Sequence, residues 1–192
     1  MGEHSGSALS FESSSEFRRW LEENHAQSSG LLLRFYKKGS GKQKLTHAAA
    51  LDEALCFGWI DGQLKPFDHQ SWIQRFTPRR RKSRWSKVNT HHVERLVAAG
   101  VMTQAGMKAV EEAKSDGRWD AAYASPRNAR PPEDFLHELS KNRRAEKHFE
   151  SLNRANVYSI VYRLQTAKKP ETREKRMKLI LAMMDKGQRF HP

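Results

Sequence analysis

Apolar positions recur along the chain with two different periods, and the change of period predicts where strands and helices lie. In the first half, Leu31–Tyr36, Trp59–Lys65 and Ser71–Thr77 are short runs of aliphatic and aromatic residues, which is typical of strands. The residues Pro66–Gln70 join the last two runs and favour a hairpin. Because Pro78 has no N–H to donate, we expect it to end the second strand of this hairpin.

Two helices are predicted within the same half from their start signals. Ser13 and Glu16 have the spacing of a capping box just ahead of an apolar stripe, which predicts a helix over about residues 13–26. Thr46 is a candidate N-cap of the second helix, and Gly58 suits the position just past its end.

From Ser86 onward the apolar pattern has a helical period throughout. One stripe is closed by Gly100 and the next by the turn at Asp116–Gly117. A loop rich in Pro, Asn and Arg follows at Ser125–Pro132 and leads into further helical stripes, the last two of which are separated by Pro170.

The fold class that follows is α+β, with a small antiparallel β-sheet in the N-terminal half and a mostly helical C-terminal half packed on or beside it. We expect residues 1–10 to be a disordered leader and residues 11–192 to form a single domain, with a helical C-terminal subregion at about 131–187.

The amino-acid composition is that of a globular protein with a highly charged surface. The 192 residues are 37% hydrophobic and 30% charged and include five Trp, which indicates a modest core under a charged surface rather than a disordered chain. No apolar run is long enough to span a bilayer, and because the start of the chain is polar we do not expect it to be a signal peptide. The lone Cys56 suits a reducing compartment, so we expect a cytoplasmic protein. The formal net charge of +13 attracts nucleic acid, anionic lipid or acidic small molecules.

The segment Gly58–Asn89 combines cations with aromatic rings. Between Arg79 and Lys87 there are six Lys or Arg residues and no acid, so the cluster repels itself unless it is solvated or meets an anion. The aromatic residues interleaved with it are Trp59, Trp72, Phe76 and Trp85. Because Arg and Trp together can hold an anion and stack a planar ring, three interpretations stay open: a solvated loop over a Trp-rich core, a nucleic-acid contact, and a site for a small anionic ligand.

Other chemistry is less strongly indicated. Cys56 follows a helical apolar stripe and is expected in the core rather than as a nucleophile. The histidines are scattered and show no metal-site spacing, so we expect no metal and no cofactor. Gly39–Lys42 has a slight likeness to a phosphate loop but is interpreted as a turn, and the adjacent Asp52 and Glu53 point apart on their helix.

Five separated motifs carry a family resemblance: CFGWIDG at 56–62, RFTPRRRKSRWSKVN at 75–89, RLVAAGVMTQAG at 95–106, DGRW at 116–119 and AKKPETREKR at 167–176. From Phe11 to about Gly187 the chain resembles the YdeI/OmpD-associated (bacteriocin-protection) family. The resemblance implies a role in resistance to bacteriocins and cationic peptides and an association with an outer-membrane porin. It implies no reaction, cofactor or catalytic residue.

The residues that match the family's motifs mark candidate positions for ligand binding. They are Trp59, Asp61, Arg75, Pro78, Arg79, Trp85, Ser86, Asn89, Thr172, Arg173 and Arg176. A helix start near Thr172 with two Arg residues three apart would make a fair anion site. Asp61 also has a structural interpretation, an ion pair with a nearby Arg.

The function we expect is therefore a non-enzymatic binding protein. Its basic, Trp-lined site would take a phosphate-bearing ligand or nucleic acid in a stress or bacteriocin-protection role. One alternative is an enzyme on a small anionic substrate with Asp61 as general acid or base and Arg79 and Arg173 holding the substrate. Another is an adaptor for an acidic protein or a membrane surface.

Overall fold

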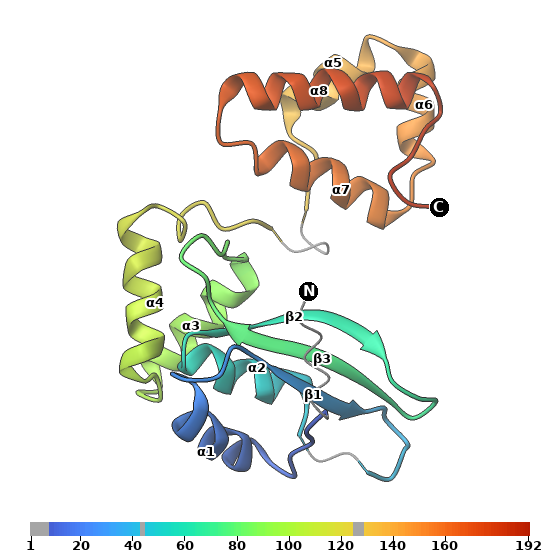
Figure 1. The fold of residues 1–192 in the computed structure, drawn as a ribbon. Coiled ribbons are helices and arrows are strands. Elements are labelled where there is room, and N and C mark those ends of the chain that lie inside the picture. The colour runs from blue at the N-terminus through green and yellow to red at the C-terminus, as the bar shows by residue number, and fades with distance from the viewer. Residues whose placement is uncertain (1–7, 43–44, 125–128) are drawn as a thin grey trace. The chain divides into compact units, whose positions relative to one another are not determined.

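The computed structural model describes residues 8–42, 45–124 and 129–192. They form two compact units (Figure 1). The N-terminal unit runs through Trp85 and resumes at Asn89–Ala121, and the C-terminal unit comprises Ser86–Val88 and Ala122–Pro192.

The N-terminal unit is built on a three-stranded antiparallel sheet in the order β1-β3-β2. Its strands are β1 (Leu31–Tyr36), β2 (Trp59–Pro66) and β3 (Ser71–Pro78). A register shift between Asp61 and Leu64 marks a bulge in β2. β2 and β3 form the predicted hairpin, and Pro78 is the last residue of its second strand.

Helices α1 (Ser14–Asn24) and α2 (His47–Cys56) lie on one face of this sheet (Figure 1). Both begin as predicted, because the Ser13 side chain accepts from the Glu16 N–H and the Thr46 side chain accepts from the Ala49 N–H. Two further helices, α3 (Lys87–Ala98) and α4 (Gln104–Ser115), follow the sheet, and α4 packs against α2.

The core of the N-terminal unit lies between α1, α2 and the inner face of the sheet. On β1 the residues alternate between buried and half-buried, so every second side chain points to the helices. The largest buried side chains of this core are Phe17, Leu21, Leu33, Phe35, Leu55, Trp59 and Phe76.

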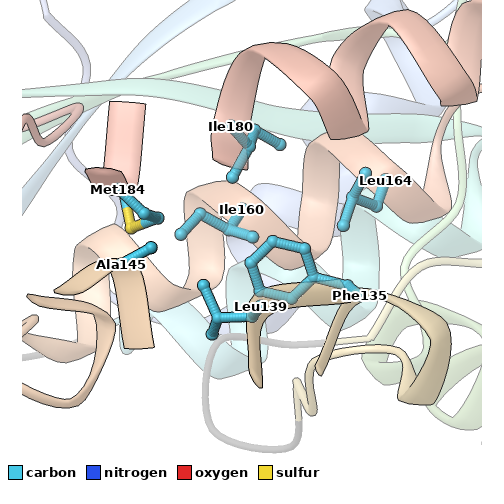
Figure 2. Packing of buried hydrophobic residues seen from close by; sticks show 7 residues of the cluster. All are labelled: Phe135, Leu139, Ala145, Ile160, Leu164, Ile180 and Met184. Carbon is cyan, nitrogen blue, oxygen red and sulfur yellow. The ribbon is translucent and has the colours of Figure 1, made fainter. Parts of the chain in front are cut away.

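The C-terminal unit is helical. It contains α5 (Glu133–Ser140), α6 (Arg143–Glu150), α7 (Arg154–Gln165) and α8 (Pro170–Asp185). Figure 2 shows its core, in which side chains from all four helices meet. They are Phe135, Leu139, Ala145, Ile160, Leu164, Ile180 and Met184.

A buried amide fastens the end of the chain to this bundle. Asn156 is fully buried in α7, and its Oδ1 accepts from the N–H groups of Phe190 at 2.8 Å and His191 at 3.0 Å. Its Nδ2 donates to Asn153 Oδ1 at 2.9 Å. The Asn156 side chain thus forms hydrogen bonds with backbone N–H groups of the C-terminal tail that would otherwise have only water as a partner.

The α+β fold class is confirmed, and the strand predicted at Leu31–Tyr36 has those bounds. The predicted leader, residues 1–10, lies mostly outside the described residues, although Leu9 N donates to Leu32 O at 2.9 Å beside β1. Most of the expected loop at Ser125–Pro132 also lies outside them. The single domain at 11–192 stays a prediction.

Candidate functional site

The cationic loop, Arg79–Arg84, follows directly after β3 and is held by its own hydrogen bonds. Arg79 N donates to Gly58 O at 2.9 Å, which ties the start of the loop to the start of β2. Ser83 N donates to Arg80 O at 2.8 Å, and Arg80 N donates to Ser83 Oγ at 2.9 Å. These reciprocal bonds close a turn, so the loop has a defined shape.

A pair of Trp rings lies behind the loop. The centroids of Trp85 and Trp119 are 4.9 Å apart, and Trp85 is only 1% exposed. The guanidinium carbon of Arg79 lies 3.5 Å from the centroid of the Trp85 ring, and its Nη1 donates to Arg84 O at 3.2 Å. A cation–π contact of this kind contributes on the order of 1 kcal/mol. Arg79 and Trp85 therefore stabilise the loop together.

The motif Asp116–Trp119, which includes one of these Trp rings, also contacts the backbone of the loop. Arg118 Nη1 donates to Ser83 O at 3.0 Å, while its Nε contacts the Asp116 carboxylate at 2.7 Å. In the sequence, this motif stands out only through the family resemblance. Its position next to the loop could not be read from its spacing, because Arg118 and Ser83 are 35 residues apart.

The other cations of the loop point into solvent. Arg80, Arg81, Lys82 and Arg84 are all exposed. Across the described ranges, 8–42, 45–124 and 129–192, the side chains of Arg80, Arg81 and Lys82 form no ion pair. Their charge is not neutralised by the protein and produces a positive field at the loop.

Asp61 belongs to a polar cluster on the inner side of the sheet. Its Oδ2 accepts from Gln74 Nε2 at 2.8 Å and lies 3.1 Å from His47 Nε2. The Asp61 and His47 side chains keep 24% and 36% of their exposure. The ring of His47 lies between Phe35 and Phe76, with centroids 5.7 and 6.3 Å away.

This arrangement differs from the expected ion pair with an Arg, because the partner of Asp61 is His47. A partly exposed His–carboxylate pair can exchange a proton with a ligand that reaches it. Neither His47 nor Gln74 was predicted to belong to the site, because His47 begins α2, Gln74 lies on β3, and no sequence pattern links either of them to Asp61. The acid–base role of Asp61 stays a prediction.

Trp59 and Arg75 lie on opposite sides of the sheet. Trp59 is 1% exposed, its Nε1 donates to His25 O at 3.2 Å, and its ring meets Trp20 edge-on at 5.8 Å. It packs within the core. Arg75 is exposed on β3, and its neighbours Gln74 and Phe76 are buried on the inner face.

The candidates on α8 make contacts within the C-terminal unit. Both Nη atoms of Arg173 donate to the Asp134 carboxylate, at 2.5 and 2.9 Å. The hydrogen bond from Arg173 holds the pKa of Asp134 below its usual range. Arg176 Nη1 donates to Arg163 O at 2.7 Å, and Thr172 is half-buried at the helix start. These contacts fasten α8 to α5 and α7.

The predicted site residues are divided between the two units. The N-terminal unit holds Trp59, Asp61, Arg75, Pro78, Arg79, Trp85 and Asn89, and the C-terminal unit holds Ser86, Thr172, Arg173 and Arg176. Ser86 forms an isolated bridge with Tyr123, and the next residue donates its N–H to Tyr123 O at 2.9 Å. A single site with walls from both sets stays a prediction.

The expectations about metal, thiol and carboxylate chemistry can be compared with the described residues. Among them, no group of three or more His, Cys, Asp and Glu side chains could hold a metal ion. Burial raises the pKa of the Cys56 thiol, as expected of a core residue. Asp52 pairs with His92 at 2.6 Å, whereas Glu53 pairs with Arg18 at 2.9 Å, so the two carboxylates point apart.

Two further surface properties bear on the function. An open groove of about 770 Å³ is lined by His25, Lys108, Glu111 and the first turn of α4, and none of the predicted site residues lines it. Within the part of the chain that the structure describes, no helix has the length and apolar character to cross a bilayer.

Comparison with known proteins gives two family matches in consecutive parts of the chain. Residues 9–109 match the model described as "Domain of unknown function (DUF8412)". Residues 128–187 match the model described as "Bacteriocin-protection, YdeI or OmpD-Associated". No curated protein and no solved structure matches the chain. The second match confirms the resemblance for the helical C-terminal part, while the motifs from Cys56 to Gly106 fall under the first model. The chain therefore belongs to the DUF8412 family and carries, after that domain, a segment that matches the model of the YdeI/OmpD-associated, bacteriocin-protection family.

Proposed function

We propose that this protein is a non-enzymatic binding protein that contacts the phosphate backbone of nucleic acid through the exposed cations of the cationic loop. The match of residues 128–187 supports a protection-type role. The observation that carries the proposal is the loop itself. Its backbone is closed by hydrogen bonds, and Arg80, Arg81 and Lys82 project from it into solvent.

A closed loop favours binding because its cations are already held near one another. Bringing mobile cations together is unfavourable, because it reduces conformational entropy and increases electrostatic repulsion. In this loop the unfavourable free energy is already included in folding, so binding does not have to supply it. A phosphate chain presents negative charges at regular spacing and releases counterions when Lys or Arg neutralises them. The Trp85 ring is buried under Arg79 and supports the loop instead of stacking with a base.

The experiment compares two triple variants of the full chain. In the loop variant, Arg80, Arg81 and Lys82 are replaced by Gln. In the matched control, Arg143, Arg144 and Lys147 of α6 are replaced by Gln, which removes the same charge from exposed positions. Binding to fluorescein-labelled DNA is followed by anisotropy between 50 and 300 mM salt, a range chosen to expose the salt dependence.

We expect the loop variant to lose at least tenfold in affinity and the slope of log K against log salt to become shallower by about 2–3, because three cations are removed. The control should stay within about twofold of the unchanged protein. Equal losses in both variants would mean that net charge alone attracts DNA, and no binding at 50 mM salt would exclude the proposal. Sedimentation with anionic vesicles, without DNA binding, would favour the membrane-surface alternative.

A further inference from the structure

We infer that the nucleic acid is single-stranded and that it lies along the open face of the sheet, from the cationic loop to the tip of the β2–β3 hairpin. This inference rests on the proposed function and deepens it. By the open face we mean the side of the sheet that α1 and α2 leave uncovered within the described part of the N-terminal unit (Figure 1).

The strand register gives the residues of this face. In an antiparallel pair, residues directly opposite each other point to the same side. Arg34 and Lys65 both lie opposite Ile73, Tyr36 lies opposite Ser71, and Leu32 lies opposite Arg75. Since Leu33, Phe35, Gln74 and Phe76 are buried on the helix side, this second set faces away from the helices.

The strands place three cations on this face, Arg34, Lys65 and Arg75, whereas the carboxylate of β2, Asp61, lies on the inner face with Gln74. Arg34 is paired with Asp68 at the hairpin tip, so the cations of these strands that could meet phosphates are Lys65 and Arg75, which form no ion pair among the described residues. The face continues through Thr77 into the cationic loop. A phosphate chain along β3 would thus meet positive charge at one end, at Arg75 in the middle and at the hairpin end.

The hairpin tip adds an aromatic surface for bases. The guanidinium carbon of Arg34 lies 4.5 Å from the ring centroid of Phe67 and 4.8 Å from that of Tyr36. Arg34 is held in place because its Nε donates to Ser71 Oγ at 3.0 Å and its Nη2 contacts Asp68 at 2.6 Å. Phe67 stays 51% exposed, so its ring is available to a planar ligand.

An exposed ring distinguishes single strands from duplexes. Bases in a duplex are already stacked on each other, whereas a single strand can stack a base on an aromatic side chain without losing base pairs. β3 has 8 residues, and at about 3.3 Å each its ends lie roughly 23 Å apart. This length suits a few nucleotides, near the lower end of the 4–16 nucleotides or so that single-strand sites occupy.

The test uses Phe67→Ala in the full chain, with Leu64→Ala as the matched control. Leu64 lies on the same hairpin and is 54% exposed, so its removal takes away a similar apolar side chain without a ring. Each protein is titrated with a labelled 12-nucleotide single strand and with a 12-base-pair duplex at one salt concentration, lengths chosen to exceed the expected site.

We expect the unchanged protein to bind the single strand at least fivefold more tightly than the duplex. Phe67→Ala should weaken single-strand binding by roughly fivefold or more without changing the salt slope, because no cation is removed. Leu64→Ala should change it by less than about twofold. Phe67→Trp should restore binding, and its fluorescence should be quenched by the single strand.

Two other outcomes separate the inference from the proposed function. The inference is wrong and the proposed function stands if the single strand and the duplex bind with equal affinity, if this affinity depends on the loop cations, and if Phe67→Ala does not change it. If neither binds to the unchanged protein, both are wrong.

Discussion

At the scale of single residues, the contact between α2 and α4 depends on the absence of a side chain at Gly106. A Cβ placed there would lie 2.2 Å from Cys56 O and 2.7 Å from its carbonyl carbon, both of them backbone atoms. Thr103 uses the same carbonyl, because its Oγ1 donates to Cys56 O at 2.6 Å and its N donates at 3.1 Å. The end of α2 and the start of α4 are thus joined at a distance that only glycine permits.

We therefore predict that Gly106→Ala lowers the free energy of unfolding of the full chain by at least about 1–3 kcal/mol, because the backbone must move to make room. Urea denaturation followed by circular dichroism would measure the loss. Helix propensity alone would raise stability by up to about 1 kcal/mol, so an unchanged or more stable variant would contradict the predicted contact.

Residue roles that depend on nearby sequence were predictable, and those that depend on the fold were not. The N-caps Ser13 and Thr46 were predicted because a cap acts on an N–H three residues later. The partner of Asp61 was not, since His47 reaches it only after α2 packs on the sheet. Likewise, Trp59 and Trp85 were expected to line the site, and their burial results from three-dimensional packing.

At the scale of elements, ion pairs connect helices within the C-terminal unit. Arg173 at the start of α8 binds Asp134 in the first turn of α5 with two hydrogen bonds. The same carboxylate accepts from Phe135 N at 2.9 Å, at a helix end where negative charge is favoured. Asp134 is 53% exposed, so solvent screens much of the pair's energy.

This pair should make the stability of the C-terminal unit depend on pH. The folded-state pKa of Asp134 is lowered, chiefly by the hydrogen bond from Arg173, so the carboxylate stabilises the fold above its unfolded pKa of about 3.9. That contribution is lost as the pH falls through the folded-state pKa.

We predict that Asp134→Asn costs about 0.5–1 kcal/mol at pH 7 and clearly less at an acidic pH below the lowered folded-state pKa of Asp134. Chemical denaturation at both pH values would measure this difference. Glu150→Gln serves as the control, because Glu150 is exposed and no ion pair involving it occurs among the described residues. An equal loss from Asp134→Asn at both pH values would show that the charge is not responsible.

The order and type of the helices and strands could be predicted from the period of the apolar positions and from the Gly and Pro residues that end these elements. Gly58, Gly100 and Gly117 all have positive φ after helices that the sequence predicted to end there. The boundary between α5 and α6 was not predicted, since only Asn142 marks it, through bonds to the N–H groups of Arg144 and Ala145. A cap of this kind looks like an ordinary polar residue until the helix geometry is known.

At the scale of the whole molecule, charge is unevenly shared between the units. Ser86–Val88 and Ala122–Pro192 carry 17 Lys and Arg against 8 Asp and Glu, which gives a net charge of +9 out of the total of +13. The cationic loop nevertheless lies in the less basic unit. Local arrangement and total charge are therefore separate properties, which is why the control on α6 matters for the binding test.

The C-terminal unit has a core of its own, and we predict that residues 122–192 fold alone. The fragment should show helical circular dichroism and a cooperative thermal transition, because the buried cluster from Phe135 to Met184 lies entirely within it. Leu139→Ala should cost about 2–5 kcal/mol, and the same amount in the fragment as in the full chain. A fragment without a cooperative transition would favour the single domain expected for residues 11–192.

The contact of Gly106 with the end of α2 has a practical consequence for following the molecule's motions. The only cysteine of the chain, Cys56, lies at this contact and is 1% exposed, with its thiol pKa raised by burial. Because the thiol is buried, a disulfide reagent can reach it only when the packing around it opens, so the rate of labelling reports how often this part of the N-terminal unit opens. Cys56 is thus a built-in probe of local unfolding. It requires no engineered label site and does not respond to events confined to the C-terminal helices.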